Sequence, residues 1–145
     1  MRNTIKVAIL SLACFLSLVS CDDDSRTLRH ETTEDVIWSS VELSAYNWEK
    51  CADRNGLNSY YKCSVRTPDI TYQVMKGGVV NCYLYDGSAQ AQLPSVRHYE
   101  NGLGQFWTRT IDYEYYSGGV TFYVTDSDFA GDAPGLLKFR LMIAL

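Results

Sequence analysis

The stretch IDYEYYSGGVTFYVT, residues 111–125, decides the fold of this chain. Gly118 and Gly119 separate two runs in which apolar and polar residues alternate, and paired glycines accept the positive backbone angles of a tight two-residue turn. We therefore expect a β-hairpin with these two glycines as its turn. The resulting register gives one apolar and one polar face, as a half-buried hairpin requires. The expected apolar pairs are Tyr115 with Phe122 and Tyr113 with Val124, and the expected polar pairs are Tyr116 with Thr121, Glu114 with Tyr123 and Asp112 with Thr125.

One charged residue interrupts the apolar side of this hairpin. Arg109 shares a row with Trp107 and Ile111, because alternate residues of a strand point to the same face. We expect either a bulge near Arg109 or a row that has already left the core at this point.

A period of two recurs along the rest of the chain, with many tyrosines, valines and phenylalanines, and this pattern is typical of strands. One short helix is also expected, with Asp69 or Thr71 as its cap and Gly77 closing it in a left-handed conformation. The expected core rows are Val41, Leu43 and Ala45; Tyr61, Cys63 and Val65; Val80, Cys82 and Leu84; and Leu137, Phe139, Leu141 and Ile143.

About seven short strands with almost no helix predict an all-β fold, a β-sandwich of one domain over residues 36–145. A small β-barrel is the alternative. About 110 residues are enough for one domain with one core.

The N-terminus reads as a lipoprotein signal peptide over residues 1–20. Arg2 and Lys6 precede an apolar run, residues 7–19, and Leu-Val-Ser at 18–20 stands directly before Cys21. The run of about 13 residues is shorter than the ~20 needed to span a bilayer, which disfavours a transmembrane anchor. We expect cleavage before Cys21 and lipid on its sulfur; the other alternative is an ordinary secretory signal that leaves Cys21 as a plain thiol.

Residues 21–35 predict a flexible acidic tether, beginning with three aspartates at 22–24. The whole chain has a net charge of -4, and loss of Arg2 and Lys6 with the signal takes the mature part to about -6. No cluster of basic residues is present, so we expect no nucleic-acid partner.

The Leu-Val-Ser-Cys motif resembles a bacterial lipobox, and the acidic run behind Cys21 is similar to the export signal of lipoproteins in the Bacteroidota. This resemblance implies an outer-membrane protein, anchored by lipid and displayed on the cell surface; the periplasmic face is the alternative. The domain also resembles a family of small Bacteroidota lipoproteins of unknown function, which implies a β fold and a lipid anchor and no catalytic residues. That resemblance rests on Trp38 and Trp48, Ile70-Thr71-x-x-Val74, Gly78-Val79-Val80, Tyr83-Leu84, Leu93-Pro94, Gly119-Val120-Thr121 and Phe139-Arg140-Leu141-x-Ile143.

Three cysteines remain in the domain. Cys51 and Cys63 flank a turn-like stretch, residues 52–59, so their spacing allows a disulfide across a hairpin. Cys82 lies in an apolar run and is expected to be a buried, unreactive thiol. None of the spacings fits a zinc site.

Catalytic patterns are sparse. His98 is a lone loop histidine, and it would activate Cys82 only if the fold brought the two together. Asp112 and Glu114 share a strand face about 7 Å apart, a separation that glycosidases use, although neighbouring acids on an exposed strand usually serve solvation. The loop 126–132 has acids spaced partly like a calcium loop, but it lacks an EF-hand's full ligand set.

Aromatic side chains are the stronger lead to a ligand. The candidate ligand-facing residues are Tyr83, Tyr85, Tyr116 and Tyr123, whose rings could stack on sugars, pack on a partner protein or cover the edge of the core. We therefore predict a non-enzymatic binding or structural module with no cofactor. Its expected partners are the membrane, through the N-terminal lipid, and an envelope protein or a glycan.

Overall fold

The computed structural model describes residues 37–145, which belong to one compact unit. The predicted signal peptide, Cys21 and the acidic tether lie outside the described residues. Across residues 37–145, no helix has the length and apolarity that crossing a membrane requires.

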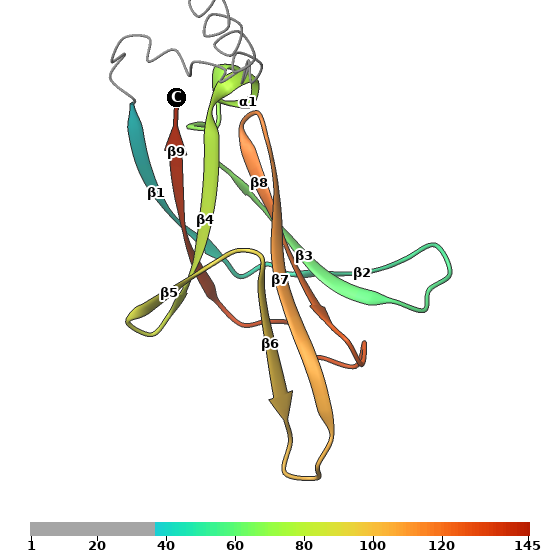
Figure 1. Ribbon diagram of the computed structural model, residues 1–145. Helices are drawn as coiled ribbons and strands as arrows, with labels where there is room; N and C mark the ends of the chain where they lie inside the picture. The colour runs from blue at the N-terminus through green and yellow to red at the C-terminus, as the bar shows by residue number, and fades with distance from the viewer. Residues whose placement is uncertain (1–36) are drawn as a thin grey trace, which may run out of the picture. The chain divides into compact units, whose positions relative to one another are not determined.

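The described residues form an all-β fold of two antiparallel sheets that are not closed into a barrel, which confirms the predicted sandwich class (Figure 1). One sheet has four strands in the order β1-β9-β4-β5, and the other has five in the order β2-β3-β8-β7-β6. The nine strands exceed the expected seven, because β2 and β5 have only four residues each. The elements are β1 (Trp38–Ala45), β2 (Glu49–Ala52), β3 (Ser59–Arg66), α1 (Tyr72–Gly77), β4 (Val79–Asp86), β5 (Ala89–Gln92), β6 (Ser95–Glu100), β7 (Phe106–Tyr116), β8 (Gly119–Asp126) and β9 (Leu137–Ala144).

The core lies between the two sheets. Phe122 of β8 and Phe139 of β9 stack across it with ring centroids 3.8 Å apart and an angle of 7° between the rings. Both side chains are fully buried. The four rows predicted from the period of two are buried or half-buried in the structure, which confirms the predicted inward faces of β1, β3, β4 and β9.

The hairpin of β7 and β8 forms, but its turn lies one residue earlier than predicted. Tyr116 pairs with Gly119, so Ser117 and Gly118 make the turn and only Gly118 has a positive φ, of 88°. The Gly118 N–H donates to the Ile70 carbonyl at 2.7 Å, and its carbonyl accepts from the Thr67 N–H at 2.9 Å. These contacts with the segment after β3 hold Gly118 in the turn.

This shift corrects every predicted pair of the hairpin and leaves its faces unchanged. The partner of each β7 residue moves by two positions along β8, and side chains two positions apart share a face. The observed pairs are Tyr115 with Val120, Tyr113 with Phe122, Glu114 with Thr121 and Asp112 with Tyr123.

The short helix is present as α1 and is capped by Thr71, whose hydroxyl accepts a hydrogen bond from the Val74 N–H at 3.3 Å. The predicted left-handed closure at Gly77 is wrong. Gly77, the last residue of the helix, does not have a positive φ, and the C-cap is Gly78 with φ at -87°, whose N–H donates to the Val74 carbonyl at 2.9 Å. A side chain on Gly78 would collide with the backbone oxygen of Ala144, so glycine is needed there for close packing against β9.

The disulfide that the spacing allows is not formed, and Cys51, Cys63 and Cys82 are all free thiols. Cys51 lies opposite Tyr60, three positions from Cys63 along β3. Three positions place the two cysteines on opposite faces of the sheet, about 10 Å apart along the strand, beyond the reach of a disulfide. Cys82 is buried as predicted, and its desolvation raises the pKa of the thiol to about 12.

Candidate functional site

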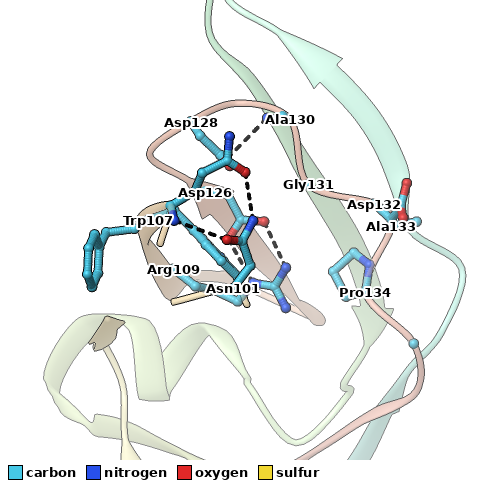
Figure 2. Close-up of a pocket in the computed structure, with 13 residues that line it drawn as sticks. Asn101, Trp107, Arg109, Asp126, Asp128, Ala130, Gly131, Asp132, Ala133 and Pro134 are labelled. Atoms are coloured by element: carbon cyan, nitrogen blue, oxygen red, sulfur yellow. Dashed lines mark hydrogen bonds and ion pairs between the residues drawn. The ribbon is translucent and has the colours of Figure 1, made fainter. Parts of the chain in front are cut away.

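A cleft of about 780 Å³ opens at one end of the sandwich, between the hairpin of β6 and β7 and the loop joining β8 to β9 (Figure 2). The β6–β7 hairpin extends beyond the end of the four-stranded sheet, as Figure 1 shows. Its inward-facing side chains therefore have no opposing sheet to cover them there, and they line a cleft instead of a core. We name this cavity the end cleft; it is lined by Asn101, Gln105, Phe106, Trp107, Arg109, Asp126, Asp128 and residues 130–135.

Arg109 and Asp126 lie directly opposite each other at the base of the end cleft. The Arg109 Nε and Nη2 atoms donate to the two Asp126 carboxylate oxygens at 2.8 and 2.7 Å, a bidentate arrangement. The Asp126 side chain is 5% exposed and that of Arg109 is 30% exposed. This hydrogen bonding is the main cause that raises the pKa of Arg109 above its ordinary value, so the guanidinium stays charged.

This geometry decides between the two expectations for Arg109. The pairing of β7 with β8 is continuous from Arg109 to Tyr116, so no bulge intervenes. The row has instead left the core, and Arg109 lies on the inner face beyond buried Ile111.

Two aromatic rings lie next to the ion pair on the same inner face. Tyr99 of β6 stacks on its cross-strand partner Trp107, with centroids 5.5 Å apart and 16° between the rings. The Arg109 guanidinium carbon lies 6.0 Å from the centroid of the Tyr99 ring. Trp107, Tyr99 and Arg109 thus form a series of flat groups beside the cleft, and such groups keep their shape at little cost in rotamer entropy.

The two loops that border the end cleft are held by local hydrogen bonds. The Asn101 side-chain oxygen accepts from the backbone N–H groups of Leu103 and Gln105, both at 3.0 Å. On the other side, Asp128 accepts from the Ala130 N–H at 3.2 Å. A side chain on Gly131 would collide with the Asp126 carboxylate, so glycine lets this loop pass close to the ion pair.

The end cleft carries an excess of negative charge. Its lining contains the three aspartates Asp126, Asp128 and Asp132 and a single arginine, Arg109, which leaves a net charge of -2. This charge disfavours phosphate groups and other anions as ligands. The described residues contain no group of three or more histidine, cysteine or acidic side chains that could hold a metal ion, so the calcium interpretation of residues 126–132 gains no support.

The four tyrosines singled out from the sequence do not meet at one site. Tyr83 and Tyr85 lie on the outer face of the four-stranded sheet, where Arg140 covers the Tyr83 ring at 5.4 Å and the Tyr85 hydroxyl donates to Glu42 at 2.8 Å. Tyr123 lies with Tyr116 on the outer face of the other sheet.

The outer face that holds Tyr123 also carries the two acids considered for catalysis. The Tyr123 hydroxyl donates to Glu114 at 2.9 Å, and desolvation followed by this contact raises the pKa of Tyr123 to about 12. Desolvation, and then the charge of Glu114, raise the pKa of Asp112. His98 is exposed on β6 and contacts Thr108, whereas Cys82 is buried in β4 of the other sheet, so these two do not form a nucleophile pair.

Sequence reasoning noticed Arg109 but missed its partner. The predicted register pairs Arg109 with Asp128, and the observed register, shifted by two, pairs it with Asp126. The sequence did contain a signal for this ion pair: an arginine on an apolar row needs a partner, and an acid lies within reach on the facing strand. The sequence did not point to Tyr99 as a site residue. β6 has almost no buried residue, so it shows no alternation of apolar and polar residues that would mark an inner face.

Comparison with protein-family models, curated proteins and solved structures finds no match.

Proposed function

We propose that this chain is a lipid-anchored protein of the bacterial cell envelope that binds a neutral glycan in its end cleft, without catalysis. The observation that carries the proposal is the Tyr99–Trp107 stack beside the bidentate pair of Arg109 and Asp126. A pyranose has an apolar face of C–H groups and a rim of hydroxyls. Flat aromatic groups next to a few fixed polar groups match both parts of such a ligand.

The charge and volume of the cleft support this ligand class. The net charge of -2 disfavours phosphorylated or uronic-acid ligands, and neutral sugars have no such penalty. A cavity of about 780 Å³ lies within the range of small-molecule sites, about 300 to 1,000 Å³.

Binding is proposed rather than hydrolysis because Asp126 is the buried one of the three aspartates that line the end cleft, whereas Asp128 and Asp132 are exposed. Both Asp126 oxygens accept hydrogen bonds from Arg109, so Asp126 is not free to donate a proton to a leaving group. Glycoside hydrolysis requires one carboxyl group that does so, together with a second on the other side of the bond.

The anchor is proposed from the residues before the domain. Cys21 is the lipidated residue, and the outer membrane, with display on the cell surface, is the proposed location. Cys21→Ser should release the chain from membranes or leave it as an uncleaved precursor, because no later segment is apolar enough to hold it. Unchanged membrane association of this variant would contradict the anchor.

Calorimetric titration of the Cys21→Ser chain with neutral oligosaccharides tests the ligand class. Trp107→Ala should weaken binding at least tenfold, whereas Val96→Ala, on the outer face of β6, should leave it unchanged. If no sugar binds and the chain instead binds an envelope protein saturably, the proposed ligand is wrong and the partner is a protein.

A further inference from the structure

A second, smaller cavity of about 170 Å³ adjoins the end cleft and runs between the two sheets. Arg109 and Pro134 line both cavities, so the two share a boundary at the ion pair. The inner pocket, as we name this cavity, has apolar walls from both sheets and ends against the core. These wall residues are Leu84, Ile111, Val124 and Leu137.

The rim of the inner pocket is polar, in contrast to its walls. Arg97 and Asp86 both line the pocket and form an ion pair at 2.7 Å, and both side chains are about half exposed. Arg109, held by Asp126, forms the side toward the end cleft. A group that enters this pocket from the end cleft therefore passes the charged Arg109 side chain and comes to rest against hydrocarbon.

The volume of the inner pocket sets the size of that group. An apolar cavity of about 150 Å³ accommodates a molecule of benzene. The inner pocket, at about 170 Å³, matches a six-membered aromatic ring or a short branched alkyl group.

We infer that the ligand of the end cleft is a glycoside with an apolar substituent, an aryl or short branched alkyl group of about six carbons, and that this substituent occupies the inner pocket. The inference rests on the proposed glycan binding and adds to it the chemical class of the ligand. The sugar lies in the end cleft beside Arg109, and the substituent extends past Arg109 toward Ile111. Burial of a ring of this size increases affinity at least tenfold, because each buried apolar carbon adds to the free energy of transfer from water.

The test uses pairs of glycosides that differ only in the substituent. The full chain carrying Cys21→Ser is titrated by calorimetry with methyl and phenyl glycosides of glucose, galactose, mannose and xylose. For the sugar that binds, the phenyl glycoside should bind at least tenfold more tightly than the methyl glycoside.

A filling variant locates the ring in the inner pocket. Ser95 lines this pocket and is only partly exposed, so the larger side chain of Ser95→Leu should fill the space that the ring would occupy. This variant should lose the phenyl preference and keep the affinity for the methyl glycoside. Val96→Leu, one position along on the outer face, adds apolar volume to the same strand and should keep the preference. Thermal unfolding of both variants verifies that they fold.

Each other outcome has a defined meaning. Equal binding of methyl and phenyl glycosides overturns the inner-pocket inference and leaves the proposed function intact. A phenyl preference that survives in Ser95→Leu also overturns it, because the ring then contacts another surface. Failure of both glycosides in every pair overturns the proposed function, and the inference with it.

Discussion

Arg109 and Asp126 are cross-strand partners, and Arg109 donates two hydrogen bonds to the Asp126 carboxylate, at 2.8 and 2.7 Å, at the point where the sandwich core gives way to a cleft. The carboxylate is nearly sealed from water and the guanidinium is not. The pair therefore does two things: it makes burial of Asp126 tolerable, and it presents a fixed polar group to a ligand.

Removal of the arginine alone should be costly. Arg109→Met leaves a buried carboxylate without a partner, and we expect a loss of about 3 kcal/mol in the free energy of unfolding, measured by urea denaturation. Adding Asp126→Leu should recover most of that loss. The control is Lys62→Met, which breaks the exposed pair with Glu49 at 3.3 Å and should cost less than about 1 kcal/mol. Equal losses for the two single variants would contradict the burial of Asp126.

The three thiols should differ in their reactivity. Cys51 is half-buried and should react with iodoacetamide in the folded protein, while Cys63 and Cys82 are buried and should react only after unfolding. The thiol pKa of about 12 keeps Cys82 protonated throughout the physiological range. Mass spectrometry of the non-reduced protein should show no peptide joining Cys51 to Cys63. Such a peptide would mean that the pairing of β2 with β3 is wrong.

Asp112 should make stability depend on pH. Its pKa is raised in the folded state, so folding favours the protonated form, and stability falls as pH rises from the ordinary value of 3.8 through the folded pKa. Asp112→Asn should therefore be more stable than the parent at pH 7, by no more than about 0.5 kcal/mol because Asp112 is exposed. The gain should disappear below about pH 3.8. Thermal unfolding measured across this range, with Glu100→Gln as a control for loss of charge, checks the prediction; a gain that persists at pH 3 would contradict it.

The two glycines of the β7–β8 hairpin should respond differently to alanine. Gly118 has φ at 88°, so Gly118→Ala should cost about 1 kcal/mol through backbone strain alone. At Gly119 the atoms nearest to the new methyl group belong to the Tyr116 ring, which is half exposed and can move aside, so Gly119→Ala should cost less. Urea denaturation of both variants ranks them. The reverse order would favour the turn at Gly118 and Gly119 that the sequence predicts.

Much of the fold follows from local patterns. The rows of β1, β3, β4 and β9 are readable because each has one face in the core, and burial produces a period of two. The short strands β2 and β5 escape this reasoning, since they lie at sheet edges and bury almost nothing. The turn position was mispredicted for another reason, because contacts of Gly118 with Thr67 and Ile70, distant in sequence, decide it.

The candidate site is less readable than the fold. Tyr99, Trp107 and Asp126 come together only through the pairing of three strands, and an error of two positions in one hairpin hides the ion pair. The tyrosines that stand out in the sequence lie on the outer faces, where Tyr85 and Tyr123 donate hydrogen bonds to neighbouring glutamates. The site exists because the β6–β7 hairpin extends beyond the four-stranded sheet. The sequence of a single strand does not reveal such a difference between the two sheets.

β9 is made after every other strand described here, yet it lies in the middle of its sheet, between β1 and β4. Among the strands of residues 37–145, β1 pairs only with β9, so during synthesis or export it must wait for a stretch on the order of 90 residues to emerge before it can pair. Until β9 arrives, Phe122 lacks its stacking partner, and the core lacks the buried side chains Phe139, Leu141 and Ile143. The nascent chain therefore passes through a partly folded intermediate with exposed apolar surface. We expect a chain truncated just before residue 137 to aggregate rather than to form a smaller domain.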